Sequence, residues 1–180
     1  MFVDLGLRQL AYVPDAGLAA LIGRAEFAAA TKPDGPDGPY NGPRGVPLAS
    51  EQEGVALLAG AWLGGQRGAL LMQSSGVGNC INMLSLAQTC RFPLLAVITM
   101  RGQWGERNPW QVPMGSSAAA VLRASGVLVF EVTSTDQVAA TVAAAGAMVF
   151  SGPAAAAVLI GQQVLGSKTF SPTNGTGGAS

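Results

Sequence analysis

Two short segments of this chain place chemically active groups at the starts of predicted helices. The segment SEQEG, residues 50–54, puts Glu51 at the first position of a helix, and MQSSGVGN, residues 72–79, joins a predicted strand to a helix through small residues. The chain has no histidine and only ten acidic residues, so few of its side chains can transfer protons. A protein so poor in acid–base groups can still be catalytic if a cofactor carries the difficult chemistry. Glu51 is therefore the first residue to consider.

The residues around Glu51 predict a capping box. In that motif Ser50 caps the helix and the side chain of Glu53 returns to the Ser50 amide. Glu53 then has a structural role, and Glu51 is left without a local partner. An acid in the first turn can also serve only to complement the helix dipole. The local pattern leaves both roles of Glu51 open.

The segment MQSSGVGN favours a close approach between the backbone and a ligand. Gly76 and Gly78 would let the chain come near a flat group, and the amides at the start of a predicted helix favour anions. The segment is neither the GxGxxG dinucleotide fingerprint nor a phosphate loop, because no lysine follows it. A tight turn capped by Asn79 would explain the same residues without any ligand.

A third segment, RGQWGERNPWQVPMG at residues 101–115, follows a predicted buried strand. Open α/β sheets bind their ligands at this position. Arg101 and Arg107 suit an anionic carboxylate, phosphonate or sulfonate, because the guanidinium fork matches those groups. The alternative is a surface loop that pairs Glu106 with Arg107 and buries both of its tryptophans at an interface.

Short apolar runs alternate with alanine-rich segments along the whole chain. The predicted strands are residues 10–13, 46–48, 69–73, 94–99, 127–132 and 155–160, and the predicted helices are residues 15–30 (capped by Asp15), 50–63, 79–89, 116–124 and 135–150. Continuous apolar strands that alternate with helices are typical of a parallel sheet covered on both faces. We therefore predict a three-layer α/β fold with about six parallel strands.

The predicted domain covers residues 1–166. Residues 31–45 are rich in Pro, Gly and Asp and form a loop too long for a simple connection, which favours a functional role. Residues 167–180 are of low complexity and are predicted to be a disordered tail.

Composition excludes several classes of function. The formal net charge is zero, which argues against nucleic-acid binding, and no apolar run reaches the length of a membrane span. The N-terminus lacks the pattern of a signal peptide, and Cys80 and Cys90 are expected to be free thiols of a cytoplasmic protein. No metal ligands are predicted, since the chain has no histidine and only two cysteines. About half of the residues are apolar and few are charged, which indicates a surface covered by a partner subunit.

Taken in order, the segments PLASEQEGVALLAGAW, GGQRGALLMQSSGVGN and RGQWGERNPWQVPMG resemble the pyrimidine-binding domain of thiamine-diphosphate enzymes. Within this group the chain is most similar to sulfopyruvate decarboxylase alpha subunits and the related phosphonopyruvate decarboxylases. The resemblance implies that the carboxylate of Glu51 hydrogen-bonds N1′ of the aminopyrimidine and so promotes ylide formation. The local pattern around Glu51 and the resemblance thus lead to the same residue.

The resemblance also implies the other site residues. The cofactor would contact Glu51, Ser75, Gly76, Val77, Asn79 and Gln111, and the substrate would contact Asp15, Arg101, Arg107 and Gln111. In the family the diphosphate and a divalent metal are bound through a GDG motif on a second domain, and this chain contains no GDG.

The implied assembly is a hetero-oligomer in which a beta subunit carries the GDG motif and holds the diphosphate and Mg²⁺. The implied reaction is the decarboxylation of an anionic 3-substituted pyruvate, such as sulfopyruvate or phosphonopyruvate, with release of CO₂ and an aldehyde. Two alternatives remain open: another thiamine-diphosphate reaction, such as carboligation, and a non-catalytic α/β assembly subunit.

Overall fold

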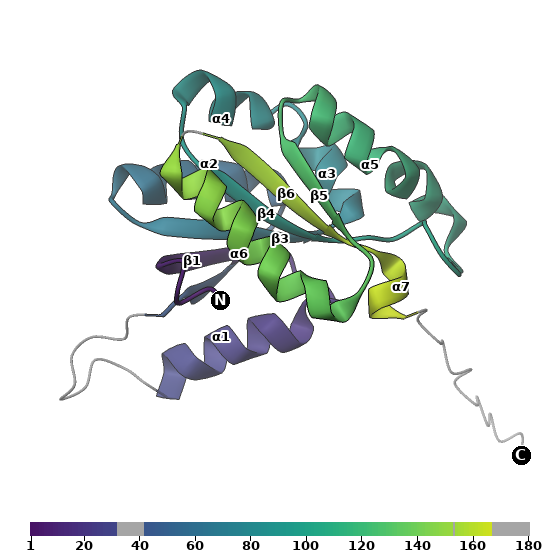
Figure 1. Ribbon diagram of the computed structural model, residues 1–180, viewed down its shortest axis with the longest axis horizontal. Helices are drawn as coiled ribbons and strands as arrows, with labels where there is room; N and C mark the ends of the chain where they lie inside the picture. Colours follow the sequence, from purple (N-terminus) through teal and green to yellow (C-terminus); the bar gives the residue numbers. More distant parts are fainter. Residues whose placement is uncertain (32–41, 153, 167–180) are drawn as a thin grey trace, which may run out of the picture.

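Six strands form one parallel sheet with the order β2-β1-β3-β4-β6-β5 (Figure 1). The structure is a computed structural model that describes residues 1–31, 42–152 and 154–166. Every pair of neighbouring strands is parallel, so all the strands end at the same edge of the sheet, the carboxyl edge. The predicted parallel α/β fold is confirmed.

The strands are β1 (Leu7–Tyr12), β2 (Arg44–Pro47), β3 (Arg67–Gln73), β4 (Leu94–Thr99), β5 (Leu128–Val132) and β6 (Ala155–Ile160). The helices are α1 (Ala19–Thr31), α2 (Glu51–Leu63), α3 (Ser74–Cys80), α4 (Leu84–Cys90), the 3₁₀ helix η1 (Pro109–Gln111), α5 (Val112–Ala124), α6 (Thr135–Ser151) and α7 (Gln162–Leu165). No helix in these described ranges is long and apolar enough to span a bilayer.

Helices cover both faces of the sheet, as Figure 1 shows. Helices α1 and α6 pack on one face, and α2, α3, α4 and α5 pack on the other. Every residue of β4 and β6 is buried, because these central strands have a helical layer above and below them. Each face has its own apolar cluster, so helices pack against the sheet from both sides and hold the strand ends at its carboxyl edge in place.

Two predicted helices begin earlier than the sequence pattern indicated. The predicted helix 79–89 is confirmed only in part: α3 starts at Ser74, directly after β3, and a turn at residues 81–83 separates it from α4. The predicted helix 116–124 starts at Val112, because Pro113 lies in its first turn, where a missing N–H costs nothing. The predicted tail 167–180 and most of the predicted loop 31–45 lie outside the described residues.

Two predicted caps are also wrong. Helix α1 begins only at Ala19, so the Asp15 carboxylate accepts from the Gly17 amide in the turn before the helix, and from two other strand ends, and does not cap α1 itself. Ser50 makes no side-chain cap, because the Glu53 amide donates to the Ser50 carbonyl at 3.1 Å. Glu53 does return to the backbone, but it accepts from the Ala49 amide at 3.0 Å. Glu51 is therefore free of any capping role, as predicted.

Candidate active site

Glu51 opens α2 and turns its side chain inward. The residue is only 8% exposed, and its Oε2 accepts a hydrogen bond from Asn79 Nδ2 at 2.8 Å. Asn79 is the only side chain or backbone group that hydrogen-bonds this carboxylate within the part of the chain that the structure describes. Oε1 is therefore an available acceptor on a shielded carboxylate.

Gly76 makes room for the Glu51 side chain on α3. A Cβ at Gly76 would lie 2.4 Å from Cγ of Glu51 and 2.5 Å from Cδ and Oε1, far inside normal contact. Cys80, on the same helix, is a buried free thiol whose pKa is raised to about 12, mainly by burial and further by the charge of Glu51. Both observations show that the carboxylate rests against α3.

The residues predicted to form a Gly/Ser turn are helical, and only two of them contact Glu51. Gly76 and Asn79 contact Glu51 directly. Ser75 Oγ donates instead to Gln73 Oε1 at 3.0 Å, at the end of β3. The Val77 side chain is fully buried in the core, so only its backbone is available to a ligand.

Asp15 connects three strand ends at the carboxyl edge. Its carboxylate accepts from Thr99 Oγ1 at 2.7 Å, from the Gly17 amide at 3.0 Å and from Gln73 Nε2 at 3.1 Å. A cleft of about 150 Å³ lies beside it, lined by Asp15, Ala16, Gly17, Thr99, Met100, Arg101, Gln162, Leu165 and Gly166. Thr99 and Gln73 were not predicted as site residues, although each is a polar residue that ends a buried strand.

Arg101 is paired with Glu106 in a bidentate ion pair. The Arg101 Nε and Nη2 atoms donate to the two carboxylate oxygens at 2.7 and 2.6 Å, and the Glu106 side chain is only 4% exposed. The predicted alternative, a pair between Glu106 and Arg107, is wrong. Arg107 is exposed and forms no ion pair with any residue in the described ranges. The charge of Arg101 is thus compensated by Glu106, whereas no acidic side chain of the described residues pairs with Arg107.

Gln111 presents a buried acceptor without a partner. The residue is 6% exposed, and its Oε1 is buried and makes no hydrogen bond in the described part of the chain. An unpaired buried amide oxygen typically costs about 1–3 kcal/mol. A Cβ at Gly102 would lie 2.4 Å from the Gln111 carbonyl oxygen, so η1 packs directly on the loop after β4. This position suits a ligand that brings an N–H donor.

Unfolding in acid should depend on Glu106. The Arg101 guanidinium lowers the pKa of Glu106 from its ordinary 4.5 to about 2. The ionised carboxylate is favoured in the folded state, so its contribution is full above about pH 4.5 and is lost as the pH falls toward 2. Urea unfolding between these pH values should show a steeper loss of stability for the native chain than for Glu106→Gln.

The control for this experiment is Glu131→Gln. Glu131 pairs with Arg123 at 2.7 Å, but both side chains are about half exposed, and such pairs add little stability. Equal acid slopes for the native chain and Glu106→Gln would contradict the role given to the buried pair.

Comparisons with known proteins agree with the sequence resemblance. The chain is 38% identical to the sulfopyruvate decarboxylase subunit alpha of Methanococcus maripaludis over 93 residues, which cover 51% of this chain and 56% of the relative. It is 45% identical over 71 residues to the same subunit of Methanocaldococcus jannaschii, covering 39% and 42%. It is 37% identical over 105 residues to the phosphonopyruvate decarboxylase of Streptomyces viridochromogenes, covering 58% and 23%. No protein-family model matches the chain.

Solved structures share the fold. A 2-oxoglutarate:ferredoxin oxidoreductase from Magnetococcus marinus matches with a TM-score of 0.65 at 15% identity, over 89% of this chain and 27% of that chain. A protein from Mycobacterium smegmatis assigned as a thiamin diphosphate-dependent enzyme matches with a TM-score of 0.64 at 17% identity, over 95% and 32%. The matched segments thus span about half of the curated alpha subunits and about a quarter to a third of the other proteins named here.

The comparisons confirm the predicted similarity to sulfopyruvate decarboxylase alpha subunits and phosphonopyruvate decarboxylases. They also confirm the fold, which this chain shares with part of the Mycobacterium smegmatis protein assigned as a thiamin diphosphate-dependent enzyme. Among the described residues, no group of three or more His, Cys, Asp or Glu side chains could hold a metal ion.

Proposed function

We propose that this chain is the pyrimidine-binding subunit of a thiamine-diphosphate-dependent decarboxylase of 2-oxo acids. The observation that carries this proposal is Glu51, a buried carboxylate at a helix start with one oxygen available as an acceptor. The relatives named as decarboxylases support the reaction class. The substrate would be an anionic 3-substituted pyruvate, such as sulfopyruvate or phosphonopyruvate, and the products would be CO₂ and an aldehyde.

The residues present fit the aminopyrimidine of thiamine diphosphate. Glu51 Oε1 and Gln111 Oε1 both lack a hydrogen-bond donor from the described chain, and an aminopyrimidine brings N–H groups. Gly76 keeps the space that the Glu51 carboxylate needs. The residues that would hold the cofactor are Glu51, Ser75, Gly76, the backbone of Val77, Asn79 and Gln111.

When bound, thiamine diphosphate supplies a nucleophilic carbon and an electron sink for the loss of CO₂. Glu51 would accept a hydrogen bond from the pyrimidine and so hold a proton at the ring nitrogen. Asn79 fixes the orientation of the carboxylate through its bond to Oε2. The low exposure of Glu51 excludes water and strengthens this interaction.

The substrate's anionic tail would be held mainly by Arg107. Its guanidinium is exposed and unpaired within the described residues, whereas that of Arg101 is already neutralised by Glu106. Arg101 would then hold the loop after β4 in place through Glu106, and its remaining N–H groups would contact the substrate. Asp15 and Gln111 would face the reacting end of the substrate from the carboxyl edge.

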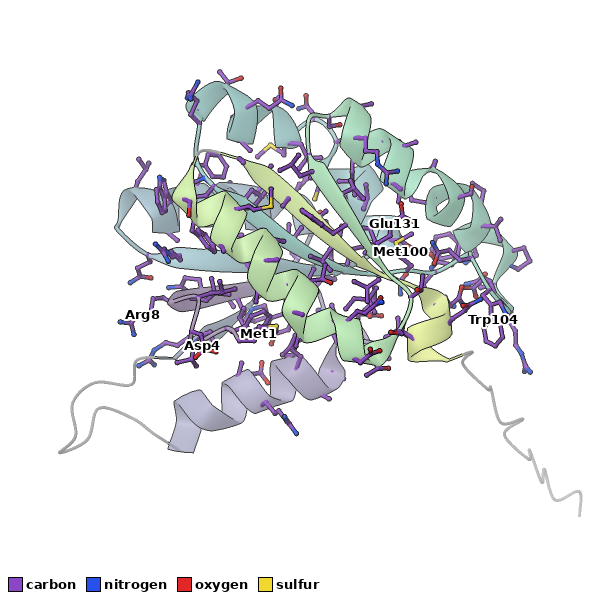
Figure 2. All side chains as sticks on the ribbon, in the orientation of Figure 1. Met1, Asp4, Arg8, Met100, Trp104 and Glu131 are labelled. Atoms are coloured by element: carbon purple, nitrogen blue, oxygen red, sulfur yellow. The ribbon has the colours of Figure 1, made fainter. Side chains whose placement is uncertain are left out.

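A beta subunit with a GDG motif would bind the diphosphate and Mg²⁺ in a cytoplasmic hetero-oligomer. Relatives named "subunit alpha" support a partner. Exposed apolar side chains near the proposed site support the same arrangement, because Trp104 is 50% exposed, Trp110 67% and Val112 43%. Figure 2 shows Trp104 projecting from the molecule beside α7.

The chain alone should bind thiamine diphosphate only weakly. The diphosphate and its metal contribute most of the expected charge interactions, and the proposal places both on the partner. Calorimetry on the isolated chain should therefore detect no tight, Mg²⁺-dependent binding. Micromolar or tighter affinity without a partner would contradict the divided site.

Reconstitution tests the reaction itself. The chain is combined with a GDG-bearing beta subunit, thiamine diphosphate and Mg²⁺, and CO₂ release is measured with sulfopyruvate, phosphonopyruvate and pyruvate. Faster release from the two anionic substrates supports the proposal. Coupled products without net aldehyde release would indicate carboligation, and a stable complex that is inactive with every substrate would indicate a non-catalytic assembly subunit.

A further inference from the structure

Gln162 directs all of its side-chain polar atoms at the loop that follows β4. It is the first residue of α7, separated from the end of β6 only by Gly161, and is only 3% exposed. Its Oε1 accepts from the backbone amides of Gln103 at 2.9 Å and Trp104 at 3.0 Å. Its Nε2 donates to Glu106 Oε2 at 3.1 Å. One buried amide therefore satisfies three groups of a single loop.

Glu106 extends this contact toward the proposed site. Besides its pair with Arg101, its carboxylate accepts from the Gly102 amide at 3.1 Å and from the Asn108 amide at 2.9 Å. The Asn108 carbonyl in turn accepts from the Gln111 amide at 3.0 Å. A continuous path of hydrogen bonds thus leads from Gln162 to the residue with the unpaired Oε1.

We infer that Gln162 is a positioning residue, which fixes the loop of residues 101–108 to the end of β6 and so holds Arg107 and Gln111 at the site. This reading rests on the proposed function. The tryptophans of this segment cannot replace it as anchors, because Trp104 and Trp110 are both at least half exposed. Removal of the Gln162 amide would leave the backbone amides of Gln103 and Trp104 without their acceptor. Glu106 Oε2 would lose one of its three donors.

Hydrogen exchange on the chain tests whether Gln162 holds the loop, without any cofactor or partner. In Gln162→Leu, the amides of Gln103 and Trp104 should exchange about tenfold faster or more, because they lose their acceptor. Gln163→Leu is the matched control, since Gln163 is the exposed next residue of α7. Unchanged protection in Gln162→Leu would overturn the inference.

The variant Gln162→Glu distinguishes an effect on the position of the loop from a general loss of fold stability. A carboxylate can still accept from the two amides, but when ionised it cannot donate to Glu106 and repels it. The charged groups around this position are Glu106 and Arg101 of the loop and Asp15 after β1. Protonation of the new carboxyl restores a donor, so activity relative to the native complex should rise as the pH is lowered from 8 to 5.5.

The reconstituted complex supplies the second readout. Gln162→Leu should lower kcat for sulfopyruvate by about 10- to 100-fold at every pH, because misplaced groups lose catalytic alignment. Gln162→Glu should lose as much at pH 8 and recover in acid, and Gln163→Glu should resemble the native complex. Faster exchange with unchanged kcat, or no acid recovery, would overturn the positioning role. An inactive native complex would instead overturn the proposed function, and the exchange rates would still decide whether Gln162 holds the loop.

Discussion

Glu51→Gln should abolish most turnover in the reconstituted complex and leave the fold intact. Glutamine has the same size and a similar helix propensity, and its carbonyl oxygen can still accept from Asn79. The amide cannot act as the ionised acceptor that the pyrimidine requires. Loss of an acid–base group of this kind typically slows the chemical step by about 10²–10⁴-fold. CO₂ release measured beside urea unfolding separates the two effects.

Glu53→Gln is the matched control for this experiment. Glu53 lies in the same first turn but accepts from the Ala49 amide, which a glutamine side chain can also do. Its replacement should leave turnover within about twofold and stability within about 1 kcal/mol. Near-normal activity in both variants would reduce Glu51 to a helix-start acid, and loss in Glu53→Gln alone would move the catalytic assignment by two positions.

The parallel sheet and the position of Glu51 could be predicted because both follow from local patterns. Apolar runs such as β4 and β6 are continuous because helices cover both of their sides. The capping pattern left Glu51 without a local partner but kept its role open, and only the family resemblance assigned it to the cofactor. The predicted capping box is wrong, although Glu53 does accept from a backbone amide just before α2, and the role of Glu51 at the cofactor stays a prediction.

Helix α3 could not be predicted from local propensity. Its sequence SSGVGNC contains two glycines and two serines, which disfavour a helix. Tertiary contacts decide the outcome: Val77 and Cys80 are buried in the core, and the Glu51 side chain packs against Gly76. Gly76, which was expected in a turn, leaves the space that the Glu51 side chain of α2 occupies.

The ion pair between Arg101 and Glu106 in the loop after β4 could not be predicted from the sequence either. Glu106 selects Arg101, five residues away, over the adjacent Arg107, because Gly102 and Gly105 turn the chain with φ of +71° and +59°. Gln162 lies 56 residues from Glu106 and belongs to no motif. Contacts of this range depend on which strands are neighbours, and here β6 lies beside β4.

Gly76→Ala should inactivate the complex through the same carboxylate as Glu51→Gln. The added Cβ would lie 2.4 to 2.5 Å from three atoms of the Glu51 side chain, which must therefore move away from α3. A displacement of about 1 Å at a catalytic group can cost about 10²-fold in rate. Overpacking of this kind should also destabilise the fold by about 1–3 kcal/mol. Turnover of the reconstituted complex and urea unfolding measure the two losses.

Gly60→Ala provides the control, because an added Cβ at Gly60 of α2 meets nothing within 4 Å. It should keep full activity and raise stability by up to about 1 kcal/mol through helix propensity. The double variant Gly76→Ala/Glu51→Gln identifies the mechanism. If Gly76 acts only by placing the Glu51 carboxylate, the combined rate loss should be no larger than that of Glu51→Gln alone. Losses that multiply would show that Gly76 affects turnover by a separate route, and the link between the two residues would then be wrong.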